Sequence, residues 1–258
     1  MTSILEKKDT TAPSVFQPAA LLREARRQKG LAAADVPRIC VLDPDGDIVR
    51  RLVDTGRARP FENWACYHTR LYTFPLGDQT AGIIGCAVGA PFAVLVAEEL
   101  FASGCRFVLS MTSAGQIVPA GSPPYFVIIE RALRDEGTSH HYLPPSEYSE
   151  ANADLVAAAE RALKDIGANA FVGSSWTTDA PFRETAEAIA AARHKGALAV
   201  EMESAALYAF AGATGRDVLC LAHVTNTMGQ GGDDFEKGEA DGTVTSLRVL
   251  EALVAIGT

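Results

Sequence analysis

The stretch VEMESAALYAFA, residues 200–211, joins the end of an apolar strand to the start of an apolar helix. Two carboxylates, Glu201 and Glu203, flank Met202 at this junction. One interpretation is helix-end electrostatics, because acids in a first turn stabilise the helix dipole by about 0.3–1 kcal/mol. The other is a sugar-binding site, since a carboxylate accepts hydrogen bonds from two neighbouring ribose hydroxyls while the thioether packs against the furanose ring.

Outward from this stretch, apolar strands alternate with helices. Strands are expected near residues 38–43, 65–74, 80–87, 107–112, 125–129, 170–175, 197–200 and 218–225, and helices near 18–30, 91–103, 154–166, 183–195, 203–214 and up to 254. The alternation predicts an α/β fold, a single domain with three α/β/α layers around a mixed, mostly parallel sheet. Functional groups in such sheets gather at the C-terminal ends of strands. The site is therefore expected after Asp43, after Ser110 and around Asn226.

The composition limits the partners and the compartment. A formal net charge of −9 argues against a nucleic acid or an anionic membrane as partner. Five scattered cysteines without a CxxC pair indicate reduced thiols. The N-terminus lacks the apolar core of a signal peptide, and no apolar run reaches the ~18 residues of a membrane span. These features predict a cytoplasmic protein.

No spacing of ligand side chains indicates a metal. His140 and His141 are adjacent, so on a strand they would point to opposite faces. The segment Gly229–Gly242 is rich in acids and glycines, and a mobile solvated loop is favoured there over a calcium site. We expect no metal and no cofactor.

Several further motifs accompany VEMES in order along the chain: CVLDPDGDIVRRL at 40–52, VGAPFAVLVAEELFASGCR at 88–106 and RDEGTSHHYLP at 134–144. Together they resemble the nucleoside phosphorylase family, nearest its uridine phosphorylase branch, over roughly residues 15–255. The resemblance implies residues 15–258 as one catalytic domain behind a flexible segment 1–14. It also implies a homo-oligomer, built from dimers and up to a hexamer in size, because the family's sites borrow residues from a neighbouring subunit.

The resemblance implies where the nucleoside binds. Ribose would be held by Glu203 with Met202 beneath it and Glu201 close by. The base would lie against residues 177–184, TTDAPFRE. From that segment Phe182 and Asp179 are candidate base contacts, and Arg183 is a candidate catalytic donor that stabilises negative charge on the departing base. A salt bridge with nearby acids is the plainer interpretation of Arg183. Gln17 stands where the family has a histidine that reaches the ribose of a neighbouring subunit.

The residue at position 226 helps to predict which kind of base is bound. Purine-cleaving relatives generally carry an aspartate near this position, which protonates the purine ring, whereas this chain reads His223-Val224-Thr225-Asn226. The resemblance therefore favours a pyrimidine, with Asn226 as a second catalytic candidate. Asn226 is as readily interpreted as a residue that satisfies loop backbone groups.

The phosphate positions depart from the family pattern. Ser113 keeps the family's hydroxyl, and Gly89 keeps the glycine turn, but Ser110 stands in place of one arginine and Gly46 in place of another. A divalent oxyanion needs two or three charged or backbone donors. We expect Ser113, Gly89 and Ser110 at the phosphate position, with a replacement arginine from elsewhere, although Asp45 and Asp47 would repel phosphate if they faced it.

Three functions remain open. The first is phosphorolysis, in which phosphate as co-substrate attacks the anomeric carbon of uridine or a related pyrimidine nucleoside and gives ribose 1-phosphate and free base. The second is hydrolysis by water, which the missing arginines favour but the missing acid at Asn226 does not. The third is a nucleoside-binding protein without turnover.

Overall fold

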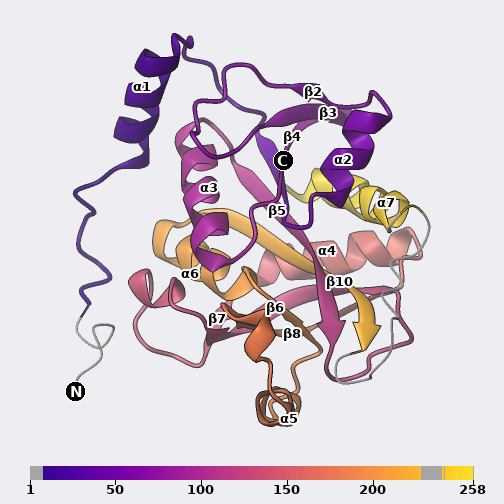
Figure 1. The fold of residues 1–258 in the computed structure, drawn as a ribbon. Coiled ribbons are helices and arrows are strands. Elements are labelled where there is room, and N and C mark those ends of the chain that lie inside the picture. The colour runs from indigo at the N-terminus through magenta and orange to yellow at the C-terminus, as the bar shows by residue number, and fades with distance from the viewer. Residues whose placement is uncertain (1–7, 228–239, 241, 258) are drawn as a thin grey trace.

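The computed structural model describes residues 8–227, 240 and 242–257. Its helices and strands alternate along the chain (Figure 1). The elements are α1 (Pro18–Lys29), β1 (Ile39–Asp43), α2 (Asp47–Asp54), β2 (Arg59–Pro60), β3 (Tyr72–Leu76), β4 (Gln79–Gly85), α3 (Ala90–Ala102), β5 (Phe107–Gln116), β6 (Tyr125–Asp135), η1 (Ser139–His141), β7 (Tyr148–Glu150), α4 (Ala153–Asp165), β8 (Ala170–Thr178), η2 (Pro181–Arg183), α5 (Ala186–His194), β9 (Ala199–Glu201), α6 (Ser204–Thr214), β10 (Asp217–Thr227), α7 (Thr243–Leu253) and η3 (Val254–Gly257).

The strands form one mixed sheet in the order β10-β6-β8-β9-β5-β1-β4-β3-β2, with β7 beside β6. β10 also pairs with β5, so β10, β6, β8, β9 and β5 close into a ring. The two longest ladders, β10 with β5 and β6 with β8, are parallel. The mixed, mostly parallel sheet expected from the sequence is therefore confirmed.

Side chains that alternate along the strands build a core on each face of the sheet. Cys40 and Leu42 of β1 pack with α3 and α6, whereas Ile39 and Val41 pack with α2, α4 and α7. Figure 1 shows these two groups of helices on opposite sides of the sheet. Because consecutive strand residues point to opposite faces, a continuous apolar run such as β1 is buried on both, which produces the three expected layers.

The strand β5 changes partner halfway along one edge. Its register with β1 ends at Ser110, and its register with β9 begins at Gly115. Residues 111–114 lie between these two ladders. A crevice at the C-terminal end of parallel strands, where neighbouring connections diverge, is a common ligand position.

Three expected elements differ in the structure. The strand predicted for 65–74 is confined to β3, because the chain before it is a loop in which the Trp64 indole N–H donates to the Thr69 hydroxyl at 2.8 Å. The turn after Asp43 continues into α2, which was not expected; Gly46 takes a φ of 76° there, and Ile48 and Leu52 are buried. The loop expected at 113–115 is strand, because β5 runs on to pair with β10 and β9.

The helix expected over 183–195 consists of two parts. The turn η2 ends at Arg183, and α5 begins at Ala186, where the Thr185 hydroxyl caps the helix by accepting the Ala188 N–H at 3.2 Å. Two sequence predictions fall on undescribed parts of the chain: residues 1–7 of the flexible N-terminal segment, and nearly all of the loop Gly229–Gly242, lie outside the described residues.

Candidate active site

A cavity of about 280 Å³ opens where β5 changes partner. Its walls are formed by the ends of β5, β9 and β10 and by the loops after β1, β4 and β8. Its lining residues are Pro44, Asp45, Val88, Thr112, Ser113, Ala114, Gly115, Pro181, Glu184, Val200, Glu201, Met202, Glu203, Thr225 and Asn226. The structure thus brings together four of the predicted substrate and catalytic residues, Glu201, Met202, Glu203 and Asn226, with the predicted phosphate residue Ser113.

Glu201 fixes the start of α6. Its Oε2 accepts the N–H groups of Glu203 and Ser204 at 2.8 and 2.7 Å, and its Oε1 accepts the hydroxyls of Ser175 and Thr177. Both carboxylate oxygens are used inside the protein, and the side chain is buried. Glu201 therefore holds the N-terminus of α6 in place, and it also lies on the wall of the cavity, close to the ribose position predicted at Glu203.

Glu203 has one oxygen bound and one oxygen available. Its Oε1 accepts the Gly89 N–H at 2.7 Å, while its buried Oε2 has no hydrogen bond of normal geometry. Only 1% of the residue is exposed. Met202 precedes it on the cavity wall and is partly buried. Met202 and Glu203, the residues predicted to hold ribose, therefore lie together on the wall of this cavity.

Burial changes the protonation of Glu203. Loss of solvent raises the pKa of this carboxyl to about 8, and the nearby Glu201 charge contributes in the same direction. The N–H groups of Gly89 and Met202 and the Thr112 hydroxyl oppose the rise. The Glu203 carboxyl therefore keeps its proton to a higher pH than a solvent-exposed glutamate does.

A β-bulge brings Asn226 into the cavity. The register of β10 against β5 shifts between Val224 and Asn226, which pairs Asn226 with Gly115. Thr225 and Asn226 consequently both line the cavity. Bulges of this kind re-aim side chains beside active sites.

A carboxylate already occupies the donors predicted for phosphate. The N–H and the hydroxyl of Ser113 both donate to Asp45, each at 2.8 Å. The Gly89 N–H, the other predicted donor, is bound to Glu203. Ser110 is buried within β5 and does not line the cavity. In this structure the three predicted phosphate residues therefore do not form one open anion site.

The loop after β8 has a different orientation from the one the sequence suggested. Phe182 is 99% exposed and Arg183 is also exposed, and neither lines the cavity. Asp179 accepts the Gly137 N–H at 2.9 Å, so it holds the loop before η1. The cavity is instead lined by Pro181 and Glu184. Phe182, Arg183 and Asp179, the residues predicted to contact the base, are therefore not among the described lining of this cavity.

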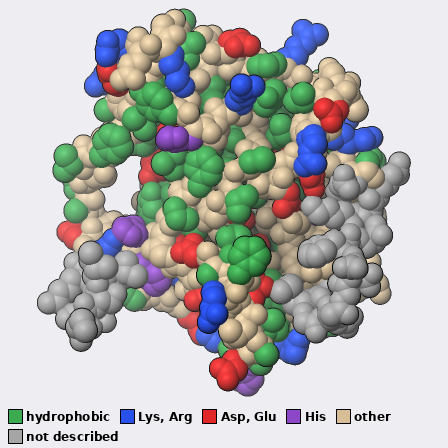
Figure 2. Space-filling model, viewed as in Figure 1, with side chains coloured by type: hydrophobic (Ala, Val, Ile, Leu, Met, Phe, Trp, Pro, Cys, Tyr) green, Lys and Arg blue, Asp and Glu red, His purple; other side chains and the backbone are tan. Residues whose placement is uncertain are grey.

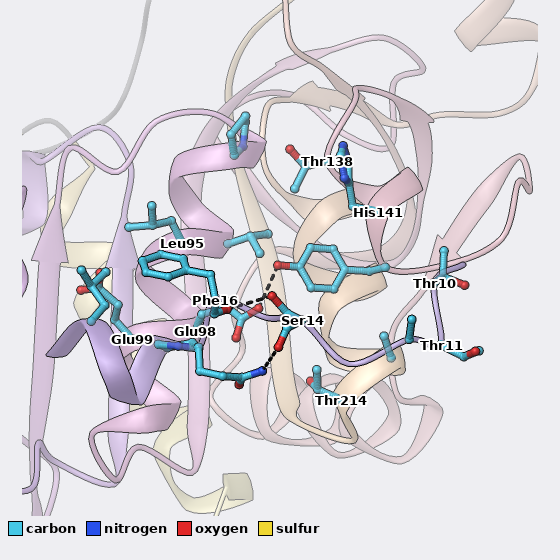
Figure 3. Close-up of a pocket in the computed structure, with 18 residues that line it drawn as sticks. Thr10, Thr11, Ser14, Phe16, Leu95, Glu98, Glu99, Thr138, His141 and Thr214 are labelled. Atoms are coloured by element: carbon cyan, nitrogen blue, oxygen red, sulfur yellow. Dashed lines mark hydrogen bonds between the residues drawn. The ribbon is translucent and has the colours of Figure 1, made fainter. Parts of the chain in front are cut away.

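Gln17 lies at another cavity, with a volume of about 740 Å³. This cavity separates the segment before α1 from α3, η1 and the end of α6; Figure 3 shows Ser14 and Phe16 opposite Leu95 and Glu98, with His141 and Thr214 nearby. The Gln17 side chain donates to the Ser14 carbonyl at 2.5 Å. The two cavities share no lining residue. A ribose contact by Gln17 would have to be to a second copy.

The charges around the smaller cavity all have one sign. Asp45, Glu184, Glu201 and Glu203 line it, and the described lining includes no Lys, Arg or His. Asp43, at the end of β1, is buried behind Asp45. Burial raises the pKa of the Asp43 carboxyl to about 7, although the N–H that Val49 donates to this carboxyl acts in the opposite direction. Such a wall disfavours a doubly charged anion unless cations come from elsewhere.

Two acidic lining residues, Asp45 and Glu184, were given no role in the site from the sequence. For Asp45 the signal was its place directly after a strand that ends at the expected edge of the sheet. Glu184 ends the segment 177–184 that was expected to contact the base, but other residues of that segment were singled out, and the tighter turn η2 sets which of them share a side. Among the described residues, no group of three or more His, Cys, Asp or Glu could hold a metal ion.

Fold and site together define an α/β protein with a buried carboxyl group on the wall of a cavity at the C-terminal edge of its sheet. The chain belongs to the phosphorylase superfamily, whose family model matches residues 38–255. The resemblance to nucleoside phosphorylases noted in the sequence is therefore confirmed.

Relatives of two kinds match at similar identity. A DeoD-type purine nucleoside phosphorylase of Streptococcus uberis is 25% identical over 188 residues, covering 71% of this chain and 79% of the relative. A uridine phosphorylase of Thermococcus kodakarensis is 26% identical over 224 residues, covering 77% and 78%. The crystal structure of a uridine phosphorylase from Vibrio fischeri superposes with a TM-score of 0.72 at 22% identity, covering 86% of this chain and 95% of that one, which supports the fold.

Proposed function

We propose that this chain is a pentosyltransferase that holds a nucleoside by its ribose and breaks the N-glycosidic bond to the base. The observation that carries the proposal is the buried Glu203 carboxyl, whose Oε1 is fixed by Gly89 and whose Oε2 has no hydrogen bond of normal geometry. A buried acceptor without a partner costs about 1–3 kcal/mol. A ribose hydroxyl in the cavity would remove that cost, and Met202 would pack against the sugar ring.

For the base we propose a pyrimidine, with uridine as the first substrate to test. Asn226 lines the cavity and has an amide in place of an acid. An amide donates and accepts hydrogen bonds, which suits the carbonyl and N–H edge of a pyrimidine. Relatives with purine and with uridine phosphorylase names match comparably, so this part of the proposal rests on Asn226.

Phosphate is the first candidate acceptor, because relatives of the family carry phosphorylase names. This reaction requires Asp45 to leave Ser113, since the two donors on Ser113 are already bound to that carboxylate. It also requires a cation from outside the described lining. We propose that a neighbouring subunit of a cytoplasmic homo-oligomer supplies it, and that no further cofactor is needed.

Water is the second candidate acceptor, and the contact between Asp45 and Ser113 is the observation that favours it. A carboxylate on the wall of the same cavity as the ribose clamp is suited to accept a proton from an attacking water. Hydrolysis needs no anion site, so the missing arginines and the acidic lining are compatible with it.

The test is the purified chain incubated with uridine, with and without phosphate, followed by chromatography for uracil, ribose and ribose 1-phosphate. Uracil together with ribose 1-phosphate, formed only with phosphate, supports phosphorolysis. Uracil and ribose at the same rate without phosphate support hydrolysis. No free base from uridine, cytidine or inosine would overturn the proposal of an enzyme and leave a nucleoside-binding protein.

The Asp45→Asn variant separates the two acceptors more sharply. In phosphorolysis the lost charge removes a competitor of phosphate, so the KM for phosphate falls about tenfold or more, as expected for a charged hydrogen bond of ~1.5–3 kcal/mol. In hydrolysis kcat falls instead, because the proton acceptor is lost. Asp54→Asn, at the exposed end of α2, is the matched control and leaves both constants unchanged.

A further inference from the structure

The tight turn η2 selects which side chains of its segment enter the active-site cavity. A 3₁₀ turn has three residues per turn, so residues i and i+3 lie on the same side. Pro181 and Glu184 have this spacing, and both line the cavity. Phe182 and Arg183, between them, are not part of the lining. Glu184 is half-buried, whereas Pro181, Phe182 and Arg183 are exposed. The segment therefore presents a carboxyl group to the site, where the sequence had suggested an arginine.

The sheet order places Glu184 at the far end of the cavity from Asp45. Glu184 follows β8 and Asp45 follows β1, and the order β8-β9-β5-β1 separates them by two strands. Glu203, just after β9, and residues 112–115 of β5 lie between. If ribose is held at Glu203 and the acceptor lies beside Asp45 and Ser113, the opposite end is left for the base.

We propose that Glu184 is the catalytic residue that gives a proton to the leaving base. This inference rests on the proposed function, because it needs a nucleoside with its ribose at Glu203. When the C1′–N bond breaks, its electron pair goes to the base, and the Glu184 hydroxyl proton goes to a carbonyl oxygen or ring nitrogen of that base. C1′ forms its new bond to the acceptor oxygen, and the Glu184 carboxylate regains a proton from solvent.

The surroundings of Glu184 suit a proton donor. Burial raises the pKa of this carboxyl above its usual value. The other ionisable groups of the described lining are the acids Asp45, Glu201 and Glu203, with no cation to stabilise the charged form. The nearest cation in the sequence, Arg183, is exposed on another side of the turn. An acid works best when its pKa lies near the working pH, and a raised carboxyl approaches that condition.

The test compares a nucleoside with a substrate whose leaving group needs no proton. The nucleoside is whichever of uridine or inosine the wild-type chain cleaves, and the second substrate is 4-nitrophenyl β-D-ribofuranoside, both with the acceptor that supports turnover. With Glu184→Gln, kcat for the nucleoside falls about 100-fold or more, in the range of general acid catalysis. The rate for the nitrophenyl riboside changes less than about threefold. Glu187→Gln, exposed in α5, is the matched control and alters neither rate.

The pH profile supplies a second readout. The measured quantity is the ratio of the wild-type rate on the nucleoside to its rate on the nitrophenyl riboside. This ratio falls as pH rises through the raised pKa of Glu184, and the fall is absent in the Glu184→Gln variant. The ratio removes the titration of Glu203, which binds the same ribose in both substrates. Equal losses on both substrates, or no loss on either, overturn the inference while nucleoside cleavage by the wild type stands. A wild type that cleaves neither substrate overturns the proposed function and this inference with it.

Discussion

At the scale of single residues, Glu203 combines a binding role with a cost in stability. In the unfolded chain its carboxyl loses its proton near pH 4.5, whereas the folded chain keeps the proton up to about pH 8. Between these values the folded state binds one proton more than the unfolded state. Its contribution to the free energy of unfolding therefore falls as pH rises, by up to about 1.4 kcal/mol per pH unit.

The Glu203→Gln variant tests both roles. Because the amide keeps the shape but has an NH2 group in place of one carboxyl oxygen, it leaves a buried group at the ribose unmatched, and activity on uridine is expected to fall about 10- to 100-fold, as a cost of ~1–3 kcal/mol implies. The amide cannot ionise, so the variant gains stability over the wild type at pH 8 and shows little gain at pH 5. Steady-state kinetics and thermal unfolding at the two pH values measure these effects. Normal turnover would reduce Glu203 to a helix-end acid.

The sequence identified those site residues that lie at the ends of strands and have a side chain suited to binding. Glu203, Met202 and Asn226 were expected in the site, and all three line the cavity. It placed the segment 177–184 at the base but singled out Arg183 and not Glu184, because a turn of three residues and a helix of 3.6 residues per turn aim neighbouring side chains differently. It left Asp45 undecided, since only the folded loop brings this carboxylate to Ser113.

At the scale of elements, the start of α6 depends on one buried side chain. Glu201 accepts two backbone N–H groups at the helix N-terminus and two hydroxyls from β8. The helix in turn carries Tyr208, whose buried hydroxyl donates to the Ile129 carbonyl of β6 at 2.6 Å. Displacing the first turn of α6 would disturb Glu203 and the core behind it together.

The Glu201→Ala variant is expected to lose stability and activity together. Removal of the carboxylate leaves the N–H groups of Glu203 and Ser204 buried without partners, at a cost of about 1–3 kcal/mol each. Urea unfolding should show a total loss of roughly 2–5 kcal/mol. Glu160→Ala, on the exposed side of α4, is the control and should change little. A fully stable, active Glu201→Ala protein would contradict this role.

Periodicity predicted the elements better than it predicted their limits. The long helices α3, α4 and α6 and the buried strands β1 and β10 match the expected apolar patterns closely, whereas β5 runs four residues beyond its expected end. The helix α2 was missed because the turn formers of DPDGD precede it immediately and obscure its short amphipathic pattern. The pairing of β10 with both β5 and β6 depends on contacts distant in sequence, which no local pattern encodes.

At the scale of the whole molecule, the segment leading to α1 exposes large apolar side chains. Val15 is 102% exposed and Phe16 69%. Figure 2 shows this segment standing away from the body, with an opening between the two and hydrophobic side chains on the nearby surface. Within the described residues, no helix is both long and apolar enough to pass through a bilayer. Contact with a second copy is the use proposed for this surface.

Light scattering is expected to give a mass of at least two chains at assay concentrations. Phe16→Asp should shift the population toward the monomer, because a charge placed in an apolar interface must be desolvated. Val53→Asp, which changes an exposed apolar residue on α2, is the control and should leave the mass unchanged. A wild-type monomer would contradict the proposed assembly.

The closed ring of strands also affects how this protein behaves when it is concentrated. Edge strands are templates for aggregation, since they offer unpaired N–H and C=O groups to another sheet. The ring gives β10 a partner on one side along its length and on the other side over Leu221–Val224, so within the described residues the longest strands present only short stretches of such a template. The sheet order ends instead at β2, two residues long with Pro60 lacking an N–H, and the side strand β7 has only three residues. Growth of one sheet onto another therefore has little backbone on which to begin, which favours a protein that stays dispersed at high concentration.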